Sequence, residues 1–166
     1  IRLGVPEKLP ARVVARLESI SKKKFKKSDL SENQTFVIGN NLKSLKSAKE
    51  RAEELGYDTR ILNSEVIGET KLVAKDLATE IIKIKKQYMP LEKPLCLIIG
   101  GETTVKVKGK GLGGRNSEFA LAFAIAIKNE SKISALFAGT DGIDGPTPAA
   151  GAYCNGNTIT EVEKIG

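Results

Sequence analysis

Three glycine-rich segments in the second half of the chain carry the charged and hydroxyl side chains best suited to chemistry. They are residues 100–104, 109–118 and 139–147. Each follows a run of residues typical of a β-strand, and open α/β sheets bind their ligands beyond the carboxyl ends of their strands. We therefore expect the three segments to form parts of one site.

The first segment, residues 100–104, places Glu102 beside the hydroxyl groups of Thr103 and Thr104. Two preceding glycines would let a ligand approach the backbone closely. Taken alone, this pattern favours an ordinary hairpin turn after Ile99 with an exposed glutamate. The alternative is a polar wall with one carboxylate.

The second segment, residues 109–118, leads into a predicted helix. Unhindered glycine amides at a helix N-terminus bind anions, and Arg115 adds a planar positive group that can hold phosphate or carboxylate in a bidentate manner. The alternative is a flexible loop in which Asn116 caps the helix and Glu118 complements the helix dipole.

The same segment also spells GxGxxG, through Gly109, Gly111 and Gly114. This motif brings a nicotinamide-dependent oxidoreductase into consideration. However, the preceding residues 103–108 alternate with lysine, whereas a dinucleotide-binding strand is a buried apolar run. The acidic residue expected about 20 residues further on is missing, and no P-loop is present.

The third segment, residues 139–147, carries Asp141 and Asp144, three positions apart on a glycine-rich turn. Magnesium is often bound by one or two carboxylates together with substrate oxygens, so this pair could hold Mg²⁺ and its phosphates. The alternative is a series of Asp-Gly turns. A connection of this length is more often functional, which favours the ligand-binding interpretation.

The composition limits the chemistry further. The chain of 166 residues has no histidine, which excludes Ser-His-Asp and Cys-His catalysis and any histidine-bearing metal site. Two cysteines, one of them inside an apolar run, indicate free thiols in a reducing setting. No apolar run is long enough for a membrane span and no leader is visible, so we expect a soluble, cytoplasmic protein.

The net charge of +7 is concentrated in a basic run over residues 22–27. We expect that run to form a solvated, mobile loop and not a nucleic-acid site, because it has one aromatic residue and no surrounding motif. The chain begins at Ile1 and its only methionine is Met89, so we expect a fragment of a longer protein.

Hydrophobic periodicity predicts the elements that position the three segments. Helices are expected over residues 10–20, from Asn40 or Asn41 to a stop at Gly56, and over 69–88 and 117–128. The third of these should turn five apolar residues inward, namely Leu72, Val73, Leu77, Ile81 and Ile84. Strands are expected over residues 35–38, 59–62, 95–99, 103–108 and 133–138.

This order predicts an α/β fold with a mixed, mostly parallel sheet covered by helices on both faces, in three layers. Residues 1–33 should form a linker, a short helix and the basic loop. Residues 34–166 should form the α/β domain, incomplete at its C-terminal end.

The three segments together resemble a known family. The run GGETTVKVKGKGLGGRNSEFALAFAIAI, followed by AGTDGIDGPTPAAGA, is similar to the MOFRL-type C-terminal domain of the glycerate 2-kinases, whose members are often labelled hydroxypyruvate reductase. The resemblance is close from Leu95 to Ala152. The chain departs from the family pattern at Ser117, where members usually have Gln, and at Pro148, where they have an acidic residue.

The resemblance implies ATP-dependent phosphorylation of D-glycerate to 2-phosphoglycerate, in a cleft shared with an N-terminal domain that contributes a catalytic lysine. ATP and Mg²⁺ would be the cofactors, and glycerate and nucleotide the partners, with no nucleic acid or membrane. A homo-oligomer is left open. The alternatives are a hydroxypyruvate reductase using NAD(P)H and a non-catalytic ligand-binding module.

Roles follow from the resemblance as hypotheses. The residues expected in catalysis are Arg115, Asp141, Asp144 and Glu102, with Asp141 and Asp144 also as metal ligands. The residues expected to bind substrate or phosphate are Thr103, Gly113, Gly114, Asn116, Glu118, Thr140 and Thr147.

Overall fold

A computed structural model describes residues 10–21, 34, 36–88 and 91–166 of the chain. The chain divides into two units, Ile1–Val37 and Ile38–Gly166. The expected basic loop over residues 22–27 lies outside the described residues. The expected domain boundary after residue 33 stays a prediction.

The described part of the first unit contains the helix α1 (Ala11–Ser21), which confirms the helix expected there. Pro10 lies just before it, and the Pro10 carbonyl accepts a hydrogen bond from the amide of Val13 at 2.8 Å. The rigid ring of proline suits the start of a helix.

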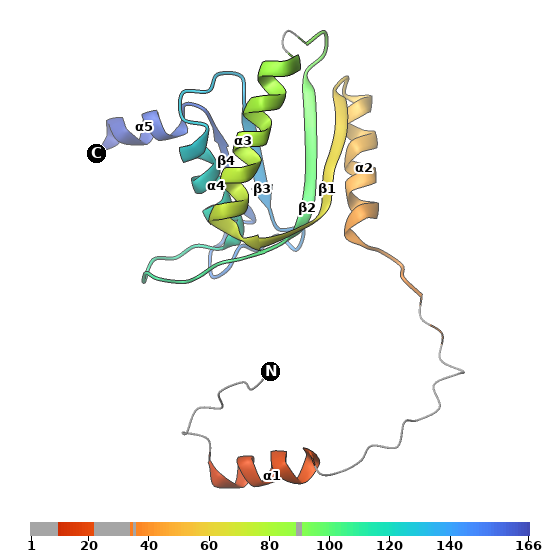
Figure 1. Ribbon diagram of the computed structural model, residues 1–166, viewed down its shortest axis with the longest axis vertical. Coiled ribbons are helices and arrows are strands. Elements are labelled where there is room, and N and C mark those ends of the chain that lie inside the picture. Colours follow the sequence, from red (N-terminus) through yellow and green to blue (C-terminus); the bar gives the residue numbers. More distant parts are fainter. Residues whose placement is uncertain (1–9, 22–33, 35, 89–90) are drawn as a thin grey trace. The chain divides into compact units, whose positions relative to one another are not determined.

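Helices and strands alternate through most of the second unit, until its last two strands follow each other directly (Figure 1). Its elements in chain order are α2 (Asn41–Glu54), β1 (Asp58–Glu69), α3 (Thr70–Tyr88), β2 (Leu95–Thr104), α4 (Arg115–Ala126), β3 (Ser134–Ala138), β4 (Gly151–Asn155) and α5 (Thr158–Ile165). The α/β class is therefore confirmed. The strands form two pairs, however, and not one continuous sheet: β1 is parallel to β2, and β3 is antiparallel to β4.

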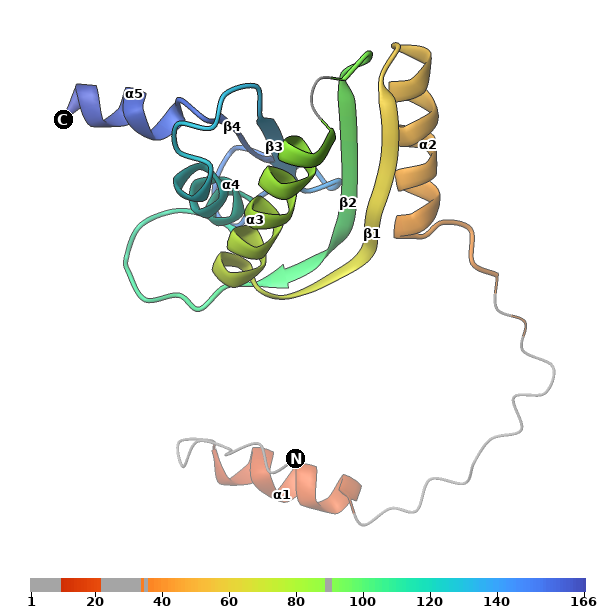
Figure 2. The same cartoon turned by 45° about the horizontal axis from the view of Figure 1, so that its top comes forward.

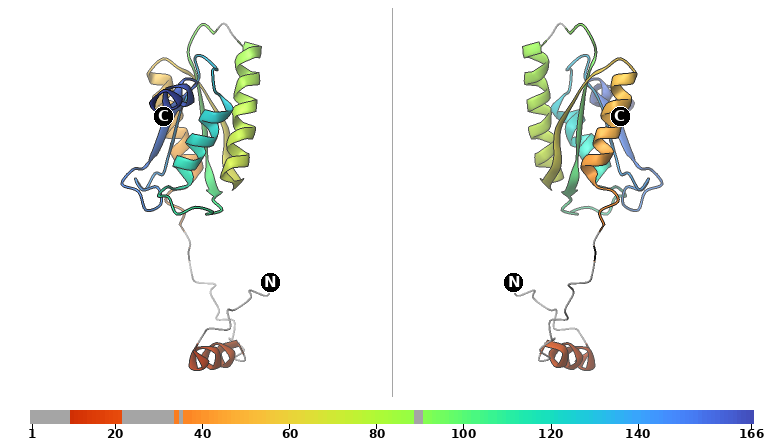
Figure 3. Two further views of the ribbon diagram at one scale, coloured as in Figure 1. Left: turned by 90° about the vertical axis from the view of Figure 1, so that its left-hand side faces the viewer. Right: turned by 90° about the vertical axis from the view of Figure 1, so that its right-hand side faces the viewer.

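The two ends of α2 agree with the sequence pattern. The Asn40 side chain accepts a hydrogen bond from the amide of Lys43 at 2.8 Å, as an N-cap does. After the helix, Gly56 has a φ of +91°, in the left-handed region that glycine adopts most readily. Figure 3 shows α2 and α3 on opposite sides of the β1–β2 pair, as a covered sheet requires.

The hairpin turn expected after Ile99 is absent, and that prediction was wrong. Instead β2 continues straight through Gly100 to Thr104, because β1 is longer than its sequence suggested and extends to Glu69 beside it. Gly101 pairs with Val66, and a Cβ on Gly101 would overlap the Val66 carbonyl oxygen. The separate strand expected over residues 103–108 is also wrong, since no strand continues beyond Thr104.

Two further predictions were wrong. The strand expected over residues 35–38 does not form within its described part, where Phe36, Val37 and Ile38 are exposed; Thr35 lies outside the described residues. In α3, Leu72 is 61 % exposed and does not point inward. Val73, Leu77 and Ile81 pack half-buried against the core as expected, and the fully buried positions of the helix are Thr70, Ala74 and Ala78.

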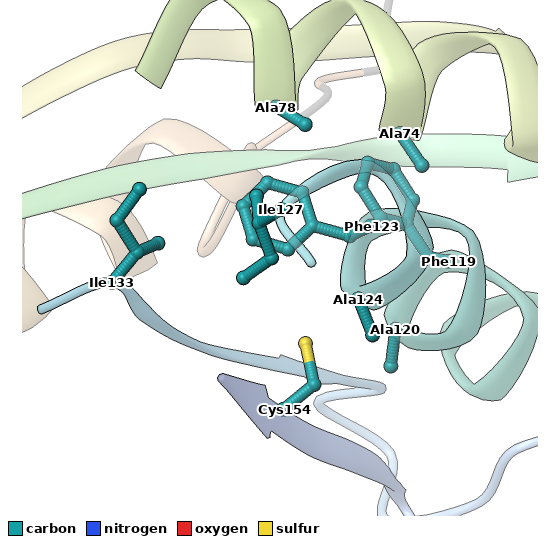
Figure 4. Packing of buried hydrophobic residues seen from close by; sticks show 9 residues of the cluster. All are labelled: Ala74, Ala78, Phe119, Ala120, Phe123, Ala124, Ile127, Ile133 and Cys154. Atoms are coloured by element: carbon teal, nitrogen blue, oxygen red, sulfur yellow. The ribbon is translucent and has the colours of Figure 1, made fainter. Parts of the chain in front are cut away.

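The core lies between α3, α4 and the β3–β4 pair (Figure 4). Small residues let α3 and α4 approach each other, and the larger side chains come mostly from α4. Phe123 is fully buried and meets the Phe137 ring at 5.3 Å between centroids, while Phe119 stacks on the same ring at 4.4 Å. Burial of each phenylalanine stabilises the fold by about 1.5–3 kcal/mol, because apolar surface is removed from water. This packing fixes the position of α4.

Both cysteines are free thiols in the structure, in agreement with the sequence. Burial raises the pKa of the Cys154 thiol to about 11, so it behaves as a core side chain. Among the described residues, none of the helices has the length and apolar character needed to cross a membrane.

Candidate functional site

The carboxyl end of β2 meets the beginning of α4 through an ion pair. Arg115 Nη1 donates to Glu102 Oε1 at 2.5 Å, which joins the first glycine-rich segment to the second. The Glu102 side chain is 75 % exposed and that of Arg115 41 % exposed, so both charges are open to a ligand. Figure 2 shows the extended loop that leaves β2 and returns to α4 at this end of the strand pair.

The first turn of α4 is capped from a distant part of the chain. Its N-cap residue is Gly114, which has no side chain to satisfy the first helical amides, so the sequence-based interpretation of Asn116 as N-cap was wrong. The Asp144 carboxylate takes that role. Its Oδ1 accepts from the Asn116 amide at 2.8 Å and its Oδ2 from the Ser117 amide at 2.7 Å.

Two side chains of α4 add to this contact. Asn116 Nδ2 donates to Asp144 Oδ1 at 3.1 Å, and Ser117 Oγ donates to Asp144 Oδ2 at 2.6 Å. Asp144 is only 1 % exposed. Burial acts to raise the pKa of Asp144, but the hydrogen bonds from Ser117 and Asn116 outweigh burial and hold the pKa below its usual value.

Glycines allow the third segment to lie directly against the second. A Cβ on Gly114 would overlap the Asp144 carboxylate, and a Cβ on Gly145 would lie 2.5 Å from the Gly113 carbonyl oxygen. Gly145 also has a φ of +60°, which disfavours other residues. The structure thus brings the three segments together at the N-terminus of α4.

Asp141 lies on the exposed side of the contact between the 139–147 loop and the start of α4. Its Oδ1 accepts from the Ile143 amide at 3.2 Å, a local turn contact. A Cβ on Gly139 would lie 2.6 Å from Asp141 Oδ1 and 3.4 Å from Asn116 Nδ2. Both side chains therefore reach the same glycine, which places Asp141 next to the start of α4.

The remaining predicted site residues divide between this cluster and its surroundings. Thr147 Oγ1 donates to the Asp144 carbonyl at 2.8 Å and so closes the third segment on itself. Thr140 is exposed, and Glu118 is half-buried in the first turn of α4. Thr103 faces Thr70, with 2.9 Å between their hydroxyl oxygens, at the junction of β1 and α3.

Sequence reasoning missed two groups near this end of the strands. Thr70 is fully buried and also lies 3.0 Å from the Thr104 carbonyl oxygen. Glu69 pairs with Lys106 at 2.8 Å, and that contact lowers the pKa of Glu69 and raises that of Lys106. The repeated tripeptide Gly-Glu-Thr, at residues 68–70 and 101–103, was a signal that could have indicated them.

Carboxylates available for a metal are few. Within the described part of the chain, no three His, Cys, Asp or Glu side chains lie close enough together to bind an ion. Asp144 already uses both carboxylate oxygens, and Asp141 is the exposed carboxylate beside it. A cation held here would take Asp141 as a ligand and need its other oxygens from elsewhere.

The chain is similar in sequence to known proteins. Residues 95–166 match the MOFRL family. The chain is 40% identical over 137 residues to the D-glycerate 2-kinase of Thermotoga maritima, covering 82% of this chain and 33% of that protein. It is 36% identical over 143 residues to the glycerate 2-kinase of Pyrococcus horikoshii, covering 84% and 32%.

A solved structure is similar as well. The crystal structure of glycerate kinase from Thermotoga maritima superposes with a TM-score of 0.72 at 40% sequence identity, over 80% of this chain and 32% of that one. The chain therefore spans about a third of the length of the proteins it matches.

Proposed function

Because this chain belongs to the glycerate 2-kinase family and carries its MOFRL domain, we propose that it forms part of an enzyme that transfers the γ-phosphoryl group of ATP to the 2-hydroxyl of D-glycerate, giving 2-phosphoglycerate and ADP. The observation that carries the proposal is the meeting of Glu102, Arg115 and the Asp141 loop at the N-terminus of α4.

The charges of this site suit an anionic substrate. Phosphoryl transfer requires positioned positive groups more than covalent chemistry, because charge is spread over the oxygens of the transferring group. The Arg115 guanidinium is exposed and already held by one carboxylate, that of Glu102. In the proposed reaction it binds the glycerate carboxylate or the transferring phosphoryl group in a bidentate manner.

Asp141 supplies the negative group of the site. It either binds a magnesium ion or accepts a hydrogen bond from the glycerate hydroxyl and orients it for attack. Its exposure and its position beside Asn116 support both roles. Bound Mg²⁺ would neutralise the phosphate oxygens of the nucleotide.

The rest of the site would come from outside this chain. Family resemblance implies an N-terminal domain with a catalytic lysine, and the matched relatives are about three times as long as the aligned region. We infer that the exposed face around Arg115 and Glu102 forms one wall of a cleft, with the other wall supplied by that domain.

One assay tests the proposal. Full-length protein carrying this chain would be mixed with D-glycerate and Mg-ATP, and the products resolved by ³¹P NMR. We expect ADP and 2-phosphoglycerate in equal amounts. Formation of the 3-phosphate isomer, or no phosphorylated glycerate at all, would contradict the proposal.

The reductase alternative is tested on the same protein by following NADH absorbance. Its motif, the literal GxGxxG at Gly109, Gly111 and Gly114, lies in the connection between β2 and α4. Oxidation of NADH on addition of hydroxypyruvate, without any phosphorylation of glycerate, would favour the reductase. We expect no change in NADH absorbance.

A further inference from the structure

The Asp144 carboxylate is buried but satisfied. It is 1 % exposed, and its hydrogen bonds come from the amides and side chains of two neighbouring residues of α4, Asn116 and Ser117. The first amides of a helix have no partner within the helix, and a negative charge near them is favourable. Gly114, at the N-cap, cannot supply that partner.

These contacts leave little room for a metal ion on Asp144. An ionised carboxylate offers about four lone-pair sites on its two oxygens. Asp144 Oδ1 already accepts two hydrogen bonds from Asn116, and Oδ2 accepts two from Ser117. A cation bound directly to Asp144 would have to displace the cap of α4.

We propose that Asp144 is a positioning residue: it joins the 139–147 loop to the first turn of α4 and so holds the Arg115 and Asp141 side chains in one fixed arrangement. The inference deepens the proposed function, since it depends on Arg115 and Asp141 acting on one ligand.

On the helix side, the contact with Asp144 sets the direction of Arg115. Arg115 is the first residue of α4 and directly precedes the two residues whose amides Asp144 accepts. Fixing those two amides fixes the backbone from which the Arg115 side chain leaves.

On the loop side, the backbone of Asp144 is held as firmly as its side chain. Its amide donates to the Ala149 carbonyl at 2.8 Å, and its carbonyl accepts from Thr147 Oγ1 at 2.8 Å. Asp141 is only three residues away, and the loop also rests on Gly113 through Gly145. Loss of the carboxylate would therefore release Asp141 and Arg115 together.

The effect on turnover should be large because catalytic groups tolerate little displacement. A misplacement of about 1 Å can lower a rate roughly a hundredfold. A loosened loop would leave nucleotide binding by the rest of the enzyme largely intact, so kcat should fall more than KM for ATP rises.

The experiment compares Asp144→Ala, Asp144→Asn, Asp141→Asn and the wild type in the full-length protein. Asp76→Ala, at an exposed position on α3, is the matched control. Hydrogen exchange followed by mass spectrometry reports on residues 113–118 and 139–147, and steady-state kinetics report kcat, KM and the magnesium concentration at half-saturation.

We expect Asp144→Ala to speed exchange in both segments by tenfold or more and to lower kcat by about tenfold to a hundredfold. It should raise the magnesium half-saturation no further than Asp141→Asn does, because any effect on magnesium would come through a displaced Asp141. Asp144→Asn should be intermediate, because its amide oxygen still accepts from the Asn116 amide while its NH₂ group opposes the Ser117 amide. Asp76→Ala should match the wild type in every measurement.

Three results would overturn the inference: unchanged exchange in both segments, loosened segments with unchanged kcat, or a magnesium half-saturation tenfold above that of Asp141→Asn, which would make Asp144 itself a metal ligand. If Asp144→Ala does not fold, Asp144→Asn decides by the same criteria. A wild type that fails to phosphorylate glycerate refutes the proposed function, whereas the exchange of the two segments still decides whether Asp144 positions them.

Discussion

Arg115 Nη1 and Glu102 Oε1 lie 2.5 Å apart, thirteen residues from each other in the sequence. The contact joins the end of β2 to the first residue of α4 across the long glycine-rich loop. Because both side chains are substantially exposed, the pair contributes at most about 1 kcal/mol to stability. Its significance is that a carboxylate already occupies the guanidinium where an anionic ligand would bind.

Replacement of Arg115 should affect turnover and not folding. We expect Arg115→Ala to lower kcat/KM for glycerate by about a hundredfold to a thousandfold, the range measured when one preorganised donor to a transition state is removed. Arg115→Lys should recover only part, because an ammonium lacks the planar fork of the guanidinium. Calorimetry should find the free energy of unfolding within about 1 kcal/mol of the wild type, and an unfolded variant would contradict the assignment.

Replacement of Glu102 should show whether Glu102 orients Arg115 or competes with the ligand for it. Glu102→Gln keeps a hydrogen-bond acceptor for Arg115 and removes the competing charge, so KM for glycerate should fall by up to about fivefold, the equivalent of 1 kcal/mol. Glu102→Ala removes the acceptor as well and should lower kcat. A rise in KM for Glu102→Gln would show that the glutamate itself assists ligand binding.

Replacement of Asp141 should reveal which of its two proposed roles applies. Asp141→Asn keeps the size of the side chain and its turn contact with Ile143 but removes the charge. If the carboxylate binds magnesium, activity should require several times more Mg²⁺ and recover in excess metal. If it orients the hydroxyl, kcat should fall at all magnesium concentrations. Full activity at the ordinary magnesium concentration would exclude both roles.

The cap of α4 should make stability depend on pH. The folded-state pKa of Asp144 is lowered from the ordinary value near 3.9, so its stabilising contribution is complete above that value and is lost as pH falls through the folded pKa. The difference in unfolding free energy between wild type and Asp144→Asn should therefore be largest from about pH 5 to 7 and shrink below about pH 4.

Chemical unfolding of both proteins across this range is the measurement. Glu69 and Glu130 also have lowered pKa values, but they are present in both proteins and cancel in the comparison. A difference that stays constant down to pH 3 would mean that the Asp144 charge does not stabilise the fold.

Local patterns in the sequence determined much of this protein. The α/β class, the Asn40 cap and Gly56 stop of α2, the helix after Pro10 and the meeting of the three glycine-rich segments could all be predicted from the sequence. These features depend on neighbours within one or two turns, where backbone geometry and hydrophobic period leave few choices.

Only the tertiary structure decided which distant groups meet. Nothing near Gly100 in the sequence indicates that β1 is long enough to keep β2 extended to Thr104, so a hairpin was expected there. Likewise, Asn116 resembled an N-cap, yet the amides of α4 are satisfied by Asp144, 28 residues further along the chain. The choice between a local and a distant partner depends on which arrangement buries the core while leaving no polar group unpaired, and that is a property of the whole fold.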